Sequence, residues 1–350
     1  MSGGNKEKGG ALIMKKVLTV VVPSYNVEKY LEQTLDSFLN DEVMEDVEVL
    51  IVDDGSKDGT AGIGRRYEEK YPDTFRLISK ENGGHGSTIN TGIAQAAGKY
   101  FKVVDGDDWV EKEGFCSLVR ELKNCSEEYI LTNYYEVNDV TGEKTEKKFA
   151  ELPVGKAMPF DEAARKVQMP MHALVIRTDI LRDNRIRLDE HCFYVDVEYI
   201  LYPVPYVRTV RYLDCFVYMY RLAVATQSVS MQGYQKHLQN HTDVIMHLLD
   251  YLGEYEKSED ADEVKYRYMA RRIAQMAETQ MNIYLSYPLS DTTVRGKFKE
   301  FDETLKQKNR LVYHWTGQYS GMLRMLRKTG FKAYTAVVVL SRLRNRKDRG

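Results

Sequence analysis

Three carboxylates in the segment Asp105-Gly-Asp-Asp108 are the residues of this 350-residue chain best placed to do chemistry. They follow the apolar run Tyr100–Val104, which predicts a buried strand. The end of such a strand projects its next residues into the crevice where α/β proteins bind ligands. Acids spaced one residue apart can share a hard divalent cation, and such a cation commonly also holds a diphosphate. A simple turn is the alternative interpretation of these residue types.

A second acid cluster, Asp53-Asp54-Gly-Ser56, follows the apolar run Val47–Val52. Its carboxylates could accept hydrogen bonds from a nucleotide base or from ribose hydroxyls, although Asp, Gly and Ser also form turns and helix caps. The carboxyl ends of parallel strands meet at one edge of a sheet. We therefore expect the two clusters to converge on one ligand.

The elements that must position these acids alternate between strands and helices. Asn26 is the expected N-cap of the first helix, and a glycine-rich turn precedes the third. We predict an α/β fold, with a doubly wound, mainly parallel, Rossmann-like sheet. The expected strands are 17–22, 47–52, 75–79 and 100–104, and the expected helices follow 26, run from about 58 to 70, and run from the turn 82–87 to 97.

The alternation loosens between 110 and 225, and helical patterns dominate after 232. The last thirty residues mix Arg and Lys with apolar residues, which fits either a peripheral contact with anionic lipid or a solvated helix face. The expected later strands are 128–137, 144–149 and 171–177, with 208–212 and 216–220 as a closing pair, and the expected later helices are 234–255, 264–287 and 291–306.

Composition and missing motifs exclude several classes of function. The net charge of −2 argues against wholesale nucleic-acid binding. The four cysteines have no CxxC spacing, so we expect no zinc site, no disulfide framework and a cytoplasmic location. No run approaches the roughly 20 apolar residues of a membrane span, no signal peptide is apparent, and residues 1–14 are expected to be a disordered leader. A P-loop, a dinucleotide fingerprint and a nucleophile elbow are all missing.

Four segments in order carry a resemblance to a known family: Val20–Glu28, Val52–Thr60, Asn82-Gly-Gly84 and Val104–Trp109. They resemble the motifs of family 2 glycosyltransferases, which are inverting, metal-dependent enzymes of the GT-A fold that use nucleotide-diphospho-sugars. The resemblance implies a GT-A domain over 15–230, with a nucleotide-sugar half at about 15–110 and an acceptor half at about 110–230. Residues 231–350 would be a helical C-terminal region with a basic tail.

The resemblance also implies roles for individual residues. Asp107, helped by Asp105, would bind Mg²⁺ or Mn²⁺, and Asp108 would only cap a helix before Trp109. One departure is Thr88-Ile-Asn90, where the family often has Ala-Arg-Asn, and the nearby His85 could replace the lost phosphate contact. The residues expected to bind the nucleotide sugar are Pro23, Tyr25, Glu28, Asp53, Asp54, Asn82, Gly84 and Asp105.

An inverting transfer needs a general base that takes the proton of the acceptor hydroxyl. In the family this is an acid well beyond the metal motif, and Asp196 stands in the matching place, with Glu198 as second choice. A helix N-terminal acid favoured by the dipole is the alternative role of Asp196. Arg221 could contact a phosphate or form a structural salt bridge. Met169–His172 could border the acceptor pocket, although a structural role of His172 is favoured.

The expected function is transfer of a sugar, with a UDP-sugar as donor, to an acceptor hydroxyl of a saccharide or lipid-linked saccharide. Assembly of cell-surface polysaccharide or glycolipid, at the inner face of the cell membrane, would suit such an enzyme. Two alternatives stay open: a sugar-phosphate nucleotidyltransferase, and a non-catalytic nucleotide-sugar-binding protein.

Overall fold

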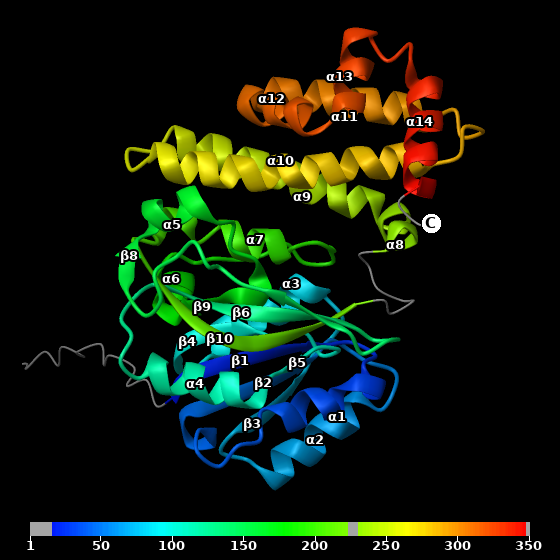
Figure 1. The fold of residues 1–350 in the computed structure, drawn as a ribbon. Helices are drawn as coiled ribbons and strands as arrows, with labels where there is room; N and C mark the ends of the chain where they lie inside the picture. The colour runs from blue at the N-terminus through cyan, green and yellow to red at the C-terminus, as the bar shows by residue number, and fades with distance from the viewer. Residues whose placement is uncertain (1–15, 223–229, 348–350) are drawn as a thin grey trace, which may run out of the picture.

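The computed structural model describes residues 16–222 and 230–347. A 10-stranded sheet lies between two layers of helices, and a bundle of further helices covers one of these layers (Figure 1). This confirms the predicted α/β class, the doubly wound sheet and the helical C-terminal extension. The predicted leader, 1–14, lies outside the described residues.

The strands pair in the order β3-β2-β1-β4-β9-β6-β10-β5, with β7 beside β6 and β8 beside β10. Strands β3, β2, β1 and β4 are parallel neighbours, and β6 is parallel to β10, whereas β9 is antiparallel to β4 and β6. The strands are β1 Lys16–Ser24, β2 Val47–Asp53, β3 Phe75–Ser79, β4 Gly98–Val103, β5 Trp109–Val110, β6 Tyr129–Asn138, β7 Lys144–Lys147, β8 Ala157–Pro159, β9 Leu174–Arg177 and β10 Thr209–Leu222.

Helices α1, α2 and α4 cover one face of the sheet, while α3, α5, α6 and α7 cover the other (Figure 1). The helices of the sheet region are α1 Glu28–Ser37, α2 Thr60–Lys70, α3 His85–Gln95, α4 Lys112–Leu122, α5 Phe160–Lys166, α6 Thr178–Asp183 and α7 Asp196–Leu201, with short 3-10 turns at Met44–Asp46, Met171–Ala173 and Val204–Tyr206. The C-terminal helices are α8 Met231–Lys236, α9 Leu238–Glu256, α10 Glu263–Ser286, α11 Val294–Lys308, α12 Arg310–Tyr319, α13 Gly321–Lys328 and α14 Tyr334–Lys347.

The parallel register brings the carboxyl ends of the first strands to one level. Ser24 of β1 lies opposite Asp53 of β2, and Asp53 lies opposite Ser79 of β3. On the other side of β1, Val21 lies opposite Val103 of β4. The loops that follow β1, β2, β3 and β4 therefore open at one edge of the sheet, as the two acid clusters required.

Three sequence-based expectations about single elements are wrong. The two expected closing strands form one strand of 14 residues, β10. The register of β10 against β6 shifts twice, between Leu213 and Phe216 and between Phe216 and Tyr218, which is where the sequence pattern suggested that the strand ends. Asn26 is not the N-cap of α1, because Val27 takes that position; Asn26 has a positive φ of 55° and accepts a hydrogen bond from the Lys57 N–H. The predicted strand 171–177 begins with a 3-10 turn.

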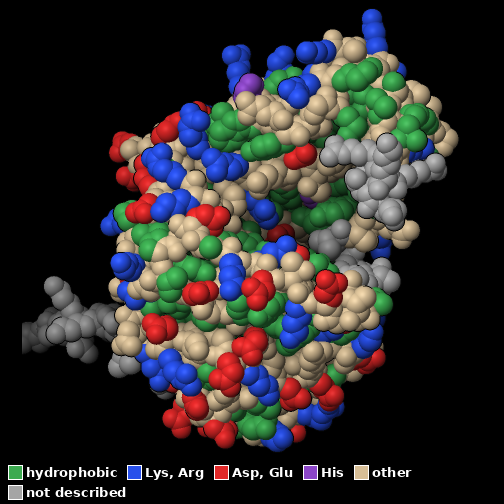
Figure 2. Space-filling model, in the orientation of Figure 1, with side chains coloured by type: hydrophobic (Ala, Val, Ile, Leu, Met, Phe, Trp, Pro, Cys, Tyr) green, Lys and Arg blue, Asp and Glu red, His purple; other side chains and the backbone are tan. Residues whose placement is uncertain are grey.

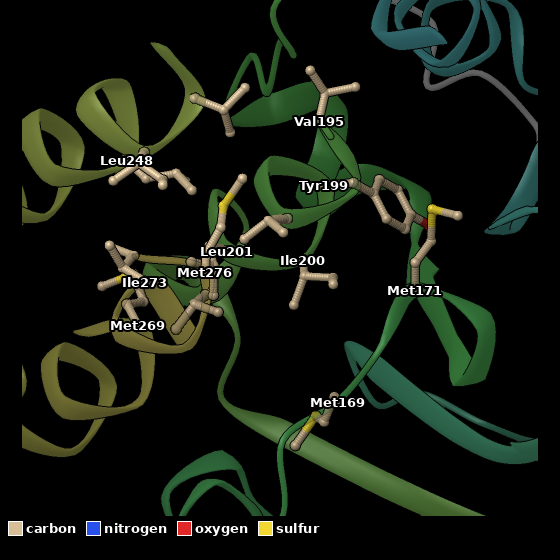
Figure 3. Close-up of a cluster of buried hydrophobic side chains, with 14 of the residues drawn as sticks. Met169, Met171, Val195, Tyr199, Ile200, Leu201, Leu248, Met269, Ile273 and Met276 are labelled. Carbon is tan, nitrogen blue, oxygen red and sulfur yellow. The ribbon is translucent and has the colours of Figure 1, made fainter. Parts of the chain in front are cut away.

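The C-terminal helices pack onto α7 through a cluster of apolar side chains (Figure 3). Ile200 and Leu201 of α7 point toward Leu248 of α9 and Ile273 of α10, whereas Tyr199 points to the other side of α7, toward Met171. All these side chains are almost fully buried. Burial of one such side chain contributes about 1.5–3 kcal/mol, so α7 is held firmly between the sheet and the C-terminal helices.

Part of the basic C-terminal segment serves internal contacts. Arg327 of α13 forms a buried ion pair with Asp302 of α11, at 2.6 Å, and Arg342 of α14 donates to the Tyr287 carbonyl. In Figure 2, acidic and basic side chains are mixed over the sheet domain, whereas basic side chains prevail over the C-terminal helices at the top. No helix in the described ranges is both long and apolar enough to cross a bilayer.

Close contact between α3 and β1 gives a test of the fold. A Cβ added to Gly92 of α3 would lie 2.2 Å from Val21 Cγ2 of β1, in the core, whereas a Cβ on Gly62 of α2 would meet nothing within 4 Å. Gly92→Ala should therefore lower the free energy of unfolding by about 1–3 kcal/mol through overpacking. Gly62→Ala should raise it by up to about 1 kcal/mol, because Ala is the better helix former. Urea denaturation of both variants measures these changes, and equal effects would contradict the packing.

Candidate active site

The acids that follow β4 lie at the open edge of the sheet and are buried from solvent to different extents. Asp105 and Asp107 are half-buried, and Asp108 is buried. Burial and the negative charge of Asp105 raise the pKa of Asp107 to about 6. No salt bridge to Asp107 exists among the described residues. The site therefore carries a carboxylate that no salt bridge neutralises in the described part of the chain, although the charges of Arg221 and His85 act on it.

Asp105 is paired with His85, the first residue of α3. His85 Nε2 lies 2.8 Å from Asp105 Oδ1. Burial would raise the pKa of Asp105, but the charge of His85 and its hydrogen bond outweigh burial and lower that pKa. The same pair raises the pKa of His85 against the effect of its own burial. The pair with Asp105 thus favours the charged form of His85 at the metal motif, whereas the sequence suggested His85 only as a substitute phosphate contact.

Asp108 does not cap a helix, so that expectation is wrong. Helix α4 begins only at Lys112, and its N-cap is Glu111. The Asp108 carboxylate instead accepts hydrogen bonds from the Tyr218 hydroxyl and the Arg221 N–H of β10, both at 2.7 Å. Burial, and then the charges of its neighbouring acids, raise the pKa of Asp108 well above its usual range. Asp108 therefore ties the loop after β4 to β10.

The Arg221 side chain makes structural contacts. It donates to the Asp107 carbonyl and to Gln33, and it pairs with Asp139. Its guanidinium also lies over the ring of Trp109, 4.6 Å from the centroid. Of the two roles suggested for Arg221, the geometry therefore favours the structural salt bridge. Through its other contacts, Arg221 also holds the loop after β4.

Asp53 and Asp54 are both buried but do different work. The two oxygens of Asp54 accept hydrogen bonds from Lys80 Nζ and from the backbone N–H groups of Gly83 and Gly84. Asp54 thereby shapes the glycine-rich turn. Asp53 Oδ1 accepts from the Ser56 N–H at 3.1 Å. Asp53 accepts fewer hydrogen bonds than Asp54. It is therefore the more available of the two carboxylates to a ligand at this edge of the sheet.

The loop after β1 lies against the loop after β4. The Gly106 N–H donates to the Pro23 carbonyl, and a Cβ at Gly106 would lie 2.8 Å from that oxygen. Tyr25 is 49% exposed, so its ring is available to a ligand. Glu28 Oε2 accepts from the Gly59 N–H, which joins this loop to the start of α2. Pro23 thus lies beside the acids that follow β4, and Glu28 lies beside the loop that leads from the second acid cluster into α2.

The glycine-rich turn explains the departure at Thr88-Ile-Asn90. Ile89 is fully buried in the core, so this position does not face a ligand. Asn90 exchanges two hydrogen bonds with the backbone of Leu188, which fastens the segment before α7 to α3. The Asn82 side chain donates to the Asp54 carbonyl, and Gly84 has a positive φ of 83°. Asn82 and Gly84 therefore act here on the shape of the turn.

Asp196 begins α7 and faces the metal motif. Burial raises its pKa, while the positive charges of Arg272 and His85 lower it and the charge of Asp105 raises it. Asp196 is thus close enough to feel both ends of the His85–Asp105 pair. Glu198, the second choice for a base, has no such influence from Asp105 or His85; burial, and then the charge of Asp189, raise its pKa to about 7. The structure brings Asp196, and not Glu198, to the site.

His172 lines the same region from the turn before β9. Its ring stacks on Tyr220, with centroids 4.0 Å apart, and meets Tyr218 edge-on. Burial and the charges of Lys102 and Arg272 lower the pKa of His172 to about 4, although Asp105 opposes them. His172 is therefore a neutral, packed side chain at neutral pH.

Arg272 is a site residue that the sequence did not reveal. It lies in α10, within the C-terminal helices, and its charge acts on Asp196 and His172. An arginine in a helical pattern gives no local signal of this role. Only the packing of α10 over α7 brings it to the site (Figure 1).

The donor set suits a hard cation. Asp105 and Asp107 offer carboxylate oxygens, which Mg²⁺ and Mn²⁺ prefer. Burial, and then the charge of Asp105, raise the pKa of Asp107, and a divalent ion would favour its ionised form. The residues present therefore fit a divalent metal ion.

A curled, mainly parallel sheet with acids at the end of its fourth strand defines the GT-A class of folds. The crystal structure of S. aureus TarS 1-349 in complex with UDP-GlcNAc has this fold: it is 18% identical, with a TM-score of 0.63, over 93% of this chain and 92% of that chain. Residues 19–183 match the family model of glycosyl transferase family 2. This chain therefore contains a family 2 glycosyltransferase domain.

Curated relatives agree with this assignment. The putative glycosyltransferase EpsH of Bacillus subtilis is 27% identical over 236 residues, which are 63% of this chain and 64% of EpsH. The minor teichoic acid biosynthesis protein GgaB of Bacillus subtilis is 27% identical over 178 residues, which are 50% of this chain and 19% of GgaB. The chain thus spans less than two thirds of the length of these relatives.

The different bonding of Asp53 and Asp54 gives a paired test. Asp54→Asn puts an amide N–H₂ where backbone N–H groups donate, which should lower the free energy of unfolding by about 1–3 kcal/mol. Asp53→Asn keeps an oxygen for the Ser56 N–H and should leave that free energy within about 0.5 kcal/mol. Urea denaturation of the two proteins checks both values. A larger loss in Asp53→Asn than in Asp54→Asn would contradict the bonding described here.

Proposed function

We propose that this protein transfers a sugar from a nucleotide-diphospho-sugar to an acceptor hydroxyl, with inversion at the anomeric carbon. The observation that carries the proposal is the meeting of Asp105, His85 and Asp196 at the edge where four parallel strands end. TarS, whose fold this chain shares, is described in complex with UDP-GlcNAc. This supports a UDP-sugar as donor.

The donor would lie across the loops after β1, β2 and β4. Asp53 would accept hydrogen bonds from the base or the ribose, beside Tyr25 of the first loop. Asp107 and Asp105 would hold Mg²⁺ or Mn²⁺, in keeping with the common use of divalent metals by family 2 enzymes. When bound, such an ion offsets the charge of the diphosphate and stabilises it as a leaving group.

Asp196 would serve as the general base. An inverting displacement needs one group that removes the acceptor's proton while the hydroxyl attacks the anomeric carbon. Burial strengthens Asp196 as a base by raising its pKa, and the charges of Arg272 and His85 oppose that rise and favour its ionised form. His85 would also hold Asp105 in place for the donor.

The acceptor would enter between the sheet domain and the C-terminal helices, where the surface is indented (Figure 2). We propose a saccharide or a lipid-linked saccharide, and the name of GgaB supports cell-surface polymer assembly. We propose the same division as the sequence analysis, with a donor half at about 15–110, an acceptor half at about 110–230 and a helical region at 231–350. Contact of the basic C-terminus with a membrane stays a prediction.

A panel of nucleotide sugars separates this function from its alternatives. A transferase should release a nucleoside diphosphate from one donor, slowly to water and faster with acceptor. A sugar-phosphate nucleotidyltransferase would instead release pyrophosphate from a nucleoside triphosphate and a sugar phosphate. Binding of a donor without any turnover would favour the non-catalytic alternative and contradict the proposal.

Replacing the proposed base should stop the chemistry and spare donor binding. Asp196→Asn keeps the size of the side chain but cannot take a proton, so kcat should fall at least about 10²-fold. The Kd for UDP should stay within a factor of about 2. In the wild type, kcat/KM should fall with decreasing pH through the raised pKa of Asp196, because the protonated acid is inactive. Near wild-type turnover of Asp196→Asn would remove Asp196 from this role.

Loss of the Asp107 carboxylate should remove the metal dependence of donor binding. Asp107→Ala deletes a proposed metal ligand, so the Kd for UDP in the presence of Mn²⁺ should rise at least about tenfold. The Kd in the presence of EDTA should change little, since the other contacts remain. Titration calorimetry measures both constants, and an unchanged affinity with Mn²⁺ would refute the assignment.

A further inference from the structure

Three potential metal ligands meet on the far side of α7, away from the donor site. Asp189 lies in the segment before α7, Glu198 within α7, and His247 in α9. One ligand atom from each residue lies within 4.8 Å of the other two. Asp189 and Glu198 are nine residues apart, whereas His247 is distant in sequence and is brought to them by the tertiary fold.

Glu198 supplies a second, independent observation. The residue is fully buried, and its Oε2 accepts a hydrogen bond from the Asp189 N–H at 2.8 Å. Its Oε1 is buried too and has no hydrogen-bond partner of full geometry within the described part of the chain, although the Tyr202 hydroxyl lies close enough to the carboxylate to interact with it. A buried polar atom without a partner is costly, and folded proteins rarely keep one without a reason. One oxygen of the same carboxylate lies in the cluster with Asp189 and His247.

The other two residues leave the cluster accessible and chemically suited to a metal. His247 Nδ1 pairs with Asp189 Oδ2, and the side chains are 53% and 32% exposed. A divalent ion could replace the proton between these two atoms and give Glu198 Oε1 a partner. One imidazole and two carboxylates form a ligand set of the kind that binds Zn²⁺, with bonds of about 2.0–2.2 Å and water in the remaining position.

We propose that Asp189, Glu198 and His247 bind a second divalent ion of the Zn²⁺ type, distinct from the ion at Asp105 and Asp107. The ion holds the segment 188–192 against α9. That segment also lies on the glycine-rich turn: the Gly83 carbonyl accepts from the His191 N–H, and a Cβ on Gly86 would lie 2.0 Å from the Asp189 carbonyl. The second ion thus fixes the segment between the donor side and the helix that carries Asp196.

The experiment uses the untagged full chain with Asp107→Ala, which removes the donor-site ion. After treatment with EDTA, this protein is titrated with ZnCl₂ in a calorimeter and its Tm is measured with and without Zn²⁺. We expect one equivalent to bind and the Tm to rise by several degrees at about 100 times the Kd. Absence of binding would overturn the proposal.

Two further variants in the same background locate the ion. His247→Ala should weaken Zn²⁺ binding at least about tenfold and abolish the rise in Tm. The matched control is His314→Ala, which removes an exposed histidine of α12 and should leave both unchanged. Glu198→Gln keeps the shape of the buried side chain and should also weaken binding at least about tenfold. Wild-type affinity in His247→Ala or Glu198→Gln would place the ion elsewhere and overturn the proposal.

Discussion

The site depends on how the protein offsets the negative charges of the three neighbouring carboxylates after β4. Like charges close together and shielded from water raise one another's pKa and oppose ionisation. His85 compensates the charge of Asp105, whereas the hydroxyl and N–H donors of β10 offset that of Asp108 only in part, so that the pKa of Asp108 stays well above its usual range. Asp107 keeps its charge without a salt-bridge partner in the described ranges. The protein thus reserves one carboxylate, at a fixed place, for a positively charged ligand.

Two long-range contacts turn this local arrangement into an active site. Strand β10 carries Tyr218 and Arg221 to the loop after β4, and its register shifts against β6 set where these residues fall. Helix α7 carries Asp196, and its apolar face is packed against α9 and α10 (Figure 3). The donor side is therefore built from consecutive strand ends, whereas the proposed base depends on a separate helix held by burial.

Much of the fold could be predicted because buried parallel strands are written as continuous apolar runs. The acids that end two of these strands were found for the same reason. The different work of Asp53 and Asp54 could not be predicted, since both follow one strand and only hydrogen-bond geometry distinguishes them. Arg272 was missed because helical periodicity indicates only which face of a helix is buried. It does not indicate which distant side chains a charged residue of that helix contacts.

The position of Arg272 has a consequence for how such proteins diversify. The segment that matches the family model ends at residue 183, yet Asp196 lies beyond it and Arg272 lies in α10. A recombination event that exchanged the C-terminal helices would also remove the cation that tunes Asp196 and the apolar face that seats α7. A protein with different C-terminal helices would therefore need another group to set the pKa of Asp196. Changes in the surface over the site and changes in its pH response should therefore be acquired together.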